Sequence, residues 1–125
     1  DCGADGTRTG GLCLQTQESW KGFLSKAAED ISFGGNYAEL YFEEENFESF
    51  LTGLEALEGI RYVHPVKERS WGQRVVRLYD PDLHIIEIGE SMKTVCRRFS
   101  ASGMTVVEIA ERMDVPVKYV TACLR

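Results

Sequence analysis

The feature that most constrains the fold is the stretch of residues 79–89, which predicts a strand, a tight turn and a second strand. A β-branched pair leads into it, Asp-Pro-Asp forms its centre, and the residues after the turn alternate between types. Because side chains alternate across a sheet, Ile86 and Ile88 share one face and Glu87 lies on the other. We therefore expect a hairpin with a carboxylate on the face opposite its apolar residues.

At 125 residues and 43% apolar, the chain has the size of one ordinary domain. Its cysteines have no CxxC spacing, no histidine beside them and no signal peptide ahead of them, which indicates free thiols in a reducing cytoplasm. They are Cys2, Cys13, Cys96 and Cys123. No apolar run reaches the roughly 18 residues that cross a bilayer, so we expect a soluble protein without a membrane partner.

The charge is uneven. Residues 1–90 hold 8 Lys/Arg against 17 Asp/Glu, a balance of −9, whereas residues 91–125 hold 6 against 3, a balance of +3. An acidic body argues against wholesale nucleic-acid binding, and the basic tail leaves only a small electrostatic opening for it.

Residues 1–36 predict turns, a short strand over residues 11–15 and one helix. Thr16 is a suitable N-cap for this helix, and an apolar stripe that includes Trp20 and Phe23 predicts about three turns covering part of a core. Gly34, Gly35 and Asn36 then break the pattern.

Residues 37–90 predict strand, helix, strand, strand, strand, an α+β unit whose helix covers one sheet face and leaves the other concave. The strands are expected over residues 37–44, 60–63, 74–79 and 84–89, and residues 67–72 are expected to form a polar loop. Asn46 caps the helix, Gly59 takes its C′ position, and Pro65 ends the second strand.

Residues 92–125 predict three helices. The first ends near Gly103, Thr105 and Glu108 form a capping box that opens the second, and Pro116 suits the first position of the third. The last two resemble a helix-turn-helix DNA-binding unit, but Lys118 and Arg125 are few cations for reading DNA. We favour a structural or dimerising tail, in which Cys123 is a small core residue.

Several segments in this order resemble the βαβββ module of the glyoxalase, bleomycin-resistance and extradiol-dioxygenase superfamily, the vicinal oxygen chelate fold. They are Glu39-Leu40-Tyr41-Phe42-Glu43, the helix from Asn46, Val63-His64-Pro65, Trp71-Gly72-Gln73-Arg74, Asp80-Pro81-Asp82-Leu83-His84 and Ile85-Ile86-Glu87-Ile88.

The resemblance implies two such modules in a half-open barrel, with metal ligands on the first and last strands of each. Glu39 and Glu87 match these two positions in residues 37–91, and Gln15 is a candidate from residues 1–36, which resemble only the end of a first module and its linker helix. A longer chain or a partner copy would complete the barrel, which favours a homodimer. Residues 92–125 form an extension. Leu83 stands where the family's turn usually has Gly, so we expect a differently shaped hairpin.

Glu39 and Glu87 on neighbouring strands would offer oxygen ligands to a divalent ion, with Zn, Ni, Mn or Fe as the possibilities. The alternative is that both are solvated or paired with Arg74 or Arg77. In glyoxalase-like chemistry, which the resemblance implies, either glutamate could also act as a catalytic base that shuttles a proton.

Four further residues are candidates for binding a ligand. Arg77 could clamp an anion or pair with Glu43, Tyr41 and Trp71 could stack on a planar group, and His64 could reach the mouth of the cavity. For each the alternative is ordinary wall packing or surface exposure. His84 shares the parity of Ile86 and is expected to be structural.

Three functions remain open at this point. The first is a glyoxalase-like small-molecule binding protein, or a lyase or isomerase similar to lactoylglutathione lyase, with or without a divalent metal. The second is a metal-free binder, as in antibiotic-sequestering relatives. The third is a ligand-responsive regulator whose helical tail touches DNA.

Overall fold

The computed structural model describes residues 12–125, and the chain divides into two units, residues 1–33 and 34–125. In the first unit, α1 (Gln17–Leu24) begins at the predicted N-cap Thr16, whose hydroxyl accepts a 3.2 Å hydrogen bond from the Ser19 N–H. The helix has 8 residues rather than the expected three turns, because Ser25 adopts a left-handed conformation (φ 52°) and ends it. A short 3₁₀ turn, η1 (Ala28–Asp30), follows.

Two expectations for this segment are wrong. Residues 12–15 form no strand, and Gly11, the first residue of that expected strand, lies outside the described residues. The stripe of α1 covers no core within the first unit, since Trp20 is 44% and Phe23 71% exposed. Both errors have one cause: a short apolar run becomes a strand, and an apolar stripe becomes buried, only when another element lies against it.

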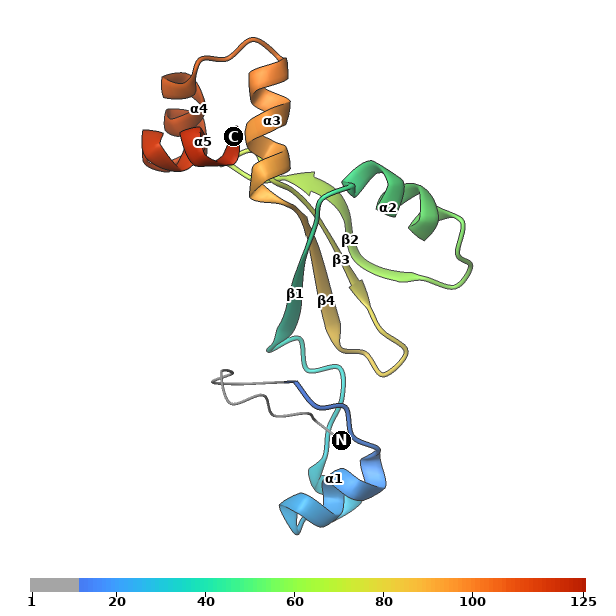
Figure 1. Cartoon of the computed structure of the whole chain (residues 1–125). Coiled ribbons are helices and arrows are strands. Elements are labelled where there is room, and N and C mark those ends of the chain that lie inside the picture. The colour runs from blue at the N-terminus through green and yellow to red at the C-terminus, as the bar shows by residue number, and fades with distance from the viewer. Residues whose placement is uncertain (1–11) are drawn as a thin grey trace. The chain divides into compact units, whose positions relative to one another are not determined.

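The second unit contains the predicted order of strand, helix and three strands. The elements are β1 (Glu39–Glu44), α2 (Phe47–Glu55), β2 (Arg61–Glu68), β3 (Arg74–Tyr79) and β4 (Ile85–Glu90). The four strands form one mixed sheet in the order β1-β4-β3-β2, in which β1 and β4 are parallel and the other pairs are antiparallel (Figure 1). Within this unit the sheet is not closed into a barrel, and one of its two faces is open.

The other face is covered by α2. Phe47 and Leu54 of this helix are buried against Val76 and Ile88 of the sheet, and burial of each large side chain contributes about 1.5–3 kcal/mol. Asn46 caps the helix as predicted, since its side-chain oxygen accepts a 3.3 Å hydrogen bond from the Ser49 N–H. This packing fixes which side chains point to the open face.

The end of α2 differs from the prediction. The helix ends at Glu55 with Ala56 as its C-cap, so Gly59 does not occupy the C′ position, although it does have a positive φ of 78°. The Leu57 N–H bonds the Leu54 carbonyl at 3.1 Å, which tightens the chain into a turn before Gly59 is reached.

The second strand also differs: Pro65 lies inside β2 rather than ending it. β2 is an edge strand, where a residue without an N–H can be tolerated, and its pairing with β3 shifts register between Tyr62 and His64 and again between His64 and Lys67. The strand continues to Glu68, so the polar loop is shorter than expected.

The hairpin between β3 and β4 contains a residue in the left-handed conformation that is not glycine. Leu83 has φ 67°, a conformation that costs a non-glycine residue about 1–2 kcal/mol. Asp80 supports the turn, because its Oδ1 accepts hydrogen bonds of 2.9 Å from the N–H groups of both Asp82 and His84. The Asp80 side chain therefore stabilises a turn in which glycine at position 83 would adopt the positive φ with less strain.

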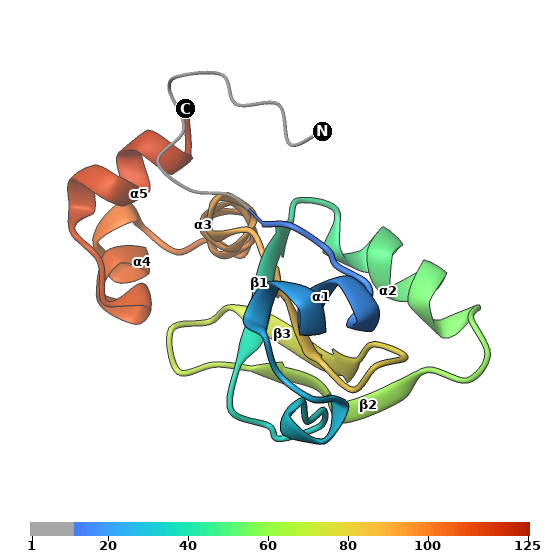
Figure 2. The same cartoon turned by 90° about the horizontal axis from the view of Figure 1, so that it is seen from below.

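The three C-terminal helices are α3 (Met92–Ala101), α4 (Val106–Met113) and α5 (Val117–Cys123). Ser91 caps α3, and Thr105 and Glu108 form the predicted capping box of α4. Pro116 is the N-cap of α5, one position earlier than predicted. Figures 1 and 2 show these helices gathered at the end of the sheet where β4 finishes.

The C-terminal helices have a core of their own, separate from the core under α2. Its buried residues are Val95, Cys96, Phe99, Ile109, Ala110, Met113 and Val120. Cys123 packs against them, and burial raises the pKa of Cys96 to about 11, which keeps that thiol protonated. Among the described residues, no helix is long and apolar enough to cross a membrane.

Candidate functional site on the open sheet face

Strand register aligns four polar side chains in one row across the sheet. Tyr41 of β1 is paired with Glu87 of β4, Glu87 with Arg77 of β3, and Arg77 with His64 of β2. Because Val76 and Ile88 face α2, their neighbours Arg77 and Glu87 face the open side. The row thus joins four of the predicted site residues on one surface.

Arg77 stands at the centre of this surface and binds two carboxylates. Its Nε donates to Glu39 Oε2 at 2.7 Å and its Nη2 to Glu39 Oε1 at 3.2 Å, a bidentate pair. The same Nη2 also donates to Glu87 Oε2. Glu39 and Glu87 therefore share the open face, as predicted. Both carboxylates pair with Arg77 and not with Arg74, and Arg77 does not pair with Glu43.

The two carboxyl groups differ electrostatically. Hydrogen bonds from Arg77 lower the pKa of Glu39, which is 36% exposed. Burial raises the pKa of Glu87, which is 8% exposed, and the neighbouring Glu39 carboxyl adds to this rise against the attraction of Arg77. The first proton taken up by the pair therefore goes to Glu87.

His64 joins the same network from β2. Its Nδ1 lies 2.7 Å from the Pro65 carbonyl oxygen, which can only accept, so Nδ1 carries the proton. Nε2 is then an acceptor and lies 3.3 Å from Nη1 of Arg77. His64 thus directs Nε2 toward the guanidinium.

One end of the open face is formed by a chain of hydrogen bonds. Trp71 Nε1 donates to Gln73 Oε1 at 3.0 Å, Gln73 Nε2 donates to the Tyr41 hydroxyl at 2.9 Å, and that hydroxyl donates to Glu43 at 3.0 Å. A Cβ on Gly89 would lie 2.6 Å from Gln73 Nε2, so the absence of a side chain there leaves room for this amide.

Gln73 is the residue that sequence reasoning missed. It is 4% exposed and connects Trp71 to Tyr41, yet in the sequence it is one polar residue between the polar loop expected at residues 67–72 and the strand expected from residue 74. The only available signal was its position directly before β3, where a side chain can turn back over the sheet. Partial burial raises the pKa of Tyr41, so its hydroxyl remains a hydrogen-bond donor.

A shallow hollow of about 360 Å³ borders Glu39 at the other end of this face. It is lined by Asn36, Tyr37, Ala38, Glu39 and Ile85. The surface therefore combines a charged centre, an aromatic end and a hollow.

Comparison with known proteins supports the architecture. The family model described as a glyoxalase-like domain matches residues 1–93. The chain belongs to the glyoxalase-like domain family. No curated protein matches the sequence.

Among solved structures, the glyoxalase-like chain is similar to a protein of unknown function from Agrobacterium tumefaciens strain C58, with 29% identity and a TM-score of 0.50. The match covers 61% of this chain and 58% of that one, so the chain spans little more than half of that protein's length.

The divalent metal that a glyoxalase-like fold implies does not fit Glu39 and Glu87 as they are arranged. A metal shared by the two carboxylates would take the place between them, and the Arg77 guanidinium lies there with donors on both. The third predicted ligand, Gln15, is in the first unit, where its Oε1 accepts a 3.0 Å hydrogen bond from Ser19. Its role as a ligand stays a prediction.

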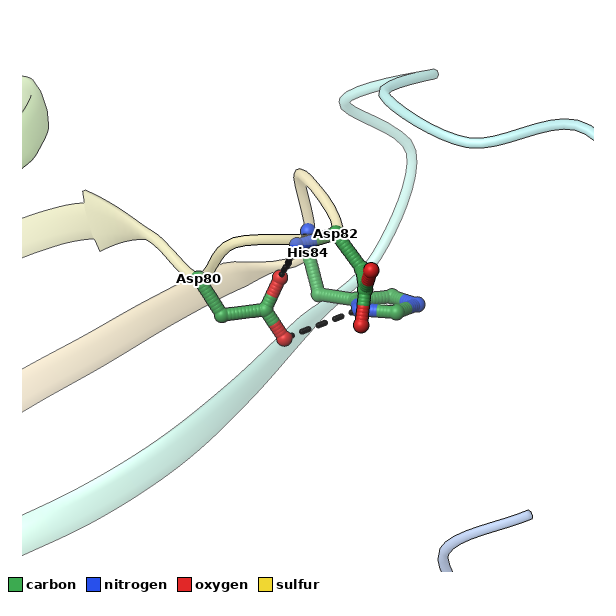
Figure 3. Close-up of side chains that lie close together, drawn as sticks. All are labelled: Asp80, Asp82 and His84. Atoms are coloured by element: carbon green, nitrogen blue, oxygen red, sulfur yellow. Dashed lines mark hydrogen bonds and ion pairs between the residues drawn. The ribbon is translucent and has the colours of Figure 1, made fainter. Parts of the chain in front are cut away.

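A second group could hold a metal ion in the hairpin of this glyoxalase-like module. One ligand atom from each of Asp80, Asp82 and His84 lies within 4.8 Å of the others (Figure 3). Asp80 Oδ2 already contacts His84 Nδ1 at 2.9 Å, and these bonds to His84 hold the pKa of Asp80 low despite its partial burial. The contacts of the turn itself thus account for the cluster, and His84 is placed in the turn as expected.

Proposed function

We propose that this glyoxalase-like protein binds a small organic molecule on its open sheet face without a divalent metal at Glu39 and Glu87. The observation that supports this is the position of Arg77, whose guanidinium supplies the positive charge that two adjacent carboxylates require. In this proposal Arg77 orders the two acids rather than clamping a ligand anion.

The ligand chemistry follows from the charges that line this face. Glu39, Glu43 and Glu87 contribute three carboxylates, against the guanidinium of Arg77 and the nearby charge of Arg69. The carboxylates outnumber the cations, so the surface favours a ligand with a cationic or hydrogen-bond-donating group. Tyr41, 47% exposed, and Trp71, 38% exposed, offer rings to a planar part of the same molecule.

Binding of matched aromatic probes tests this proposal. We expect aromatic amines to shift the amide resonances of β1 and β4, and aromatic carboxylates of the same shape to leave them unchanged. Glu39→Gln should weaken amine binding about tenfold, the size expected for a hydrogen bond to a charged group. Glu58→Gln, an exposed acid in the loop after α2, is the control. Preferential binding of the carboxylates would refute the proposed ligand class.

A second candidate, a lyase or isomerase similar to lactoylglutathione lyase, rests on the difference between the two carboxyl groups. A lowered pKa suits Glu39 as the base, and a raised pKa suits Glu87 as the proton donor, for transfer of a proton beside a carbonyl. The test is conversion of the methylglyoxal–glutathione adduct to its thioester, which Glu39→Gln and Glu87→Gln should each abolish. Turnover that survives both substitutions would exclude this assignment.

A regulator that touches DNA is the least favoured function. α4 and α5 are joined by a turn in which Asp114 is left-handed (φ 55°), a geometry compatible with a helix-turn-helix unit. Within residues 91–125, however, Arg98 and Arg112 are already paired with Glu90 and Glu68. We propose that the helices serve a structural role, and salt-dependent retention on DNA would contradict it.

We also propose that a second copy of the chain completes the barrel. β1 has β4 on one side, and within residues 12–125 no strand pairs with its other edge. Leu40 and Phe42 of β1 are 36% and 51% exposed, which an added element would cover. Light scattering coupled to size-exclusion chromatography distinguishes a dimer from a monomer.

A further inference from the structure

The loop of residues 69–73, here called the Trp71 loop, contacts both the C-terminal helices and the open sheet face. It connects β2 to β3 at the end of the sheet where the helices gather (Figures 1 and 2). The Arg69 N–H bonds the Gln73 carbonyl at 2.8 Å, and the Gly72 N–H bonds the Arg69 carbonyl at 2.9 Å. These bonds close the loop on itself, so its residues move together.

On the helical side, two arginines bind the backbone of the Trp71 loop. Arg98 of α3 donates from Nη2 to the Gly72 carbonyl at 2.5 Å. Arg112 of α4 donates from Nη1 to the Ser70 carbonyl and from Nη2 to Glu68 at 3.0 Å. Charge-assisted hydrogen bonds of this kind are stronger than those between neutral groups.

Phe99 packs directly against the same loop. A Cβ on Gly72 would lie 2.5 Å from Phe99 Cε2 and closer still to Cζ, so the ring touches the loop backbone. The guanidinium carbons of Arg98 and Arg112 lie over the Phe99 ring, at 4.9 and 5.5 Å from its centroid. Phe99 also belongs to the helical core, which ties loop position to helix packing.

On the side of the sheet, Gln73 connects the Trp71 loop to the open face by hydrogen bonds. Its Nε2 donates to the Tyr41 hydroxyl and, at 2.9 Å, to the Glu90 carbonyl. Trp71 is held against Gln73 by its own indole N–H. A displacement of Gly72 therefore shifts both Trp71 and the hydrogen bond of Tyr41.

We propose that Arg98 and Arg112 are positioning residues that hold the Trp71 loop at the end of the open face, so that the C-terminal helices and the ligand surface are energetically coupled. The coupling is reciprocal: a ligand that fixes Trp71 and Tyr41 also stabilises the contacts of the loop with α3 and α4. This inference deepens the proposed function, since the surface that it couples to the helices is the proposed binding face.

Hydrogen exchange in the ligand-free protein tests the coupling. Arg112→Gln should speed exchange of the Arg69 and Gly72 amides about tenfold, because it removes charge-assisted bonds to the loop. Arg97→Gln, which removes the same charge from an exposed position of α3, is the matched control and should leave these amides unchanged. Arg112 is preferred to Arg98 because Arg98 also binds the buried Glu90.

The reverse perturbation starts from the sheet. Tyr41→Phe removes the hydroxyl that accepts from Gln73, and we expect it to shift the ring resonances of Phe99 and the Trp71 indole N–H while amides of β4 exchange as before.

Two results would overturn the inference. Loop amides that exchange at the wild-type rate in Arg112→Gln would show that the arginine does not hold the loop. Equal acceleration in the loop and in β4 would show a general loss of stability instead of positioning. Failure of the amine probes to bind would overturn the proposed ligand and leave both exchange results standing.

Discussion

Replacing Gly72 by alanine tests the contact between the Trp71 loop and the C-terminal helices. Gly72 is buried and has φ 87°, and a Cβ at this position would overlap the ring of Phe99. Alanine therefore encounters two separate penalties, one from the backbone and one from packing.

The two penalties can be estimated independently. A left-handed conformation costs a non-glycine residue about 1–2 kcal/mol. Forcing an extra carbon into a packed site costs about 1–3 kcal/mol, because Phe99 must leave its position in the helical core. Gly72→Ala should thus lower the free energy of unfolding by about 2–5 kcal/mol, equivalent to roughly 8–20 °C in melting temperature.

Gly59 and Gly103 provide matched controls. Their φ values are 78° and 95°, and a Cβ at either would meet no atom within 4 Å. Gly59→Ala and Gly103→Ala should therefore show the backbone penalty alone, about 1–2 kcal/mol. Urea denaturation followed by circular dichroism measures all three variants. If Gly72→Ala costs no more than its controls, Phe99 does not pack against the loop as described here.

The remaining predictions concern three other sites. Glu90 is fully buried, and burial alone would raise its pKa, but hydrogen bonds from Arg98 and Arg74 lower the pKa below the ordinary value of 4.5. The ionised Glu90 therefore stabilises the fold above pH 4.5, and this stabilisation is lost as the pH falls through the pKa of the folded state. Glu90→Gln should lower the free energy of unfolding at neutral pH by about 3–5 kcal/mol and make it fall less steeply in acid, which denaturation at a series of pH values measures. The same fall in acid as in the wild type would contradict this. Leu83→Gly should be about 1 kcal/mol more stable than Leu83→Ala in thermal melts, because only glycine relieves the positive φ, and equal stability would argue against that strain. Arg77→Ala leaves Glu39 and Glu87 without their cation, so titration calorimetry should show that this variant binds Mn²⁺ or Zn²⁺. If the wild-type protein instead contains a bound metal that the Glu87→Gln variant lacks, our assignment of Arg77 as that cation is refuted.

Local pattern was sufficient for much of the fold. The caps at Asn46 and Thr105 follow from short-range hydrogen bonding, and the strand and helix order follows from apolar periodicity. Two of the wrong predictions failed for reasons that are not local. Pro65 is accepted inside β2 because that strand lies at the sheet edge, and α1 has no buried residue because nothing else in the first unit packs against its stripe.

For the site, the sequence by itself indicated that Glu39 and Glu87 lie on one face, because each alternates with apolar residues along its own strand and side chains alternate with a strict period of two. Only the tertiary structure decided that Arg77 lies between them and that Gln73 joins Trp71 to Tyr41. Those contacts depend on which strands become neighbours and in what register, and this is set by long-range packing, which leaves no periodic trace in the sequence.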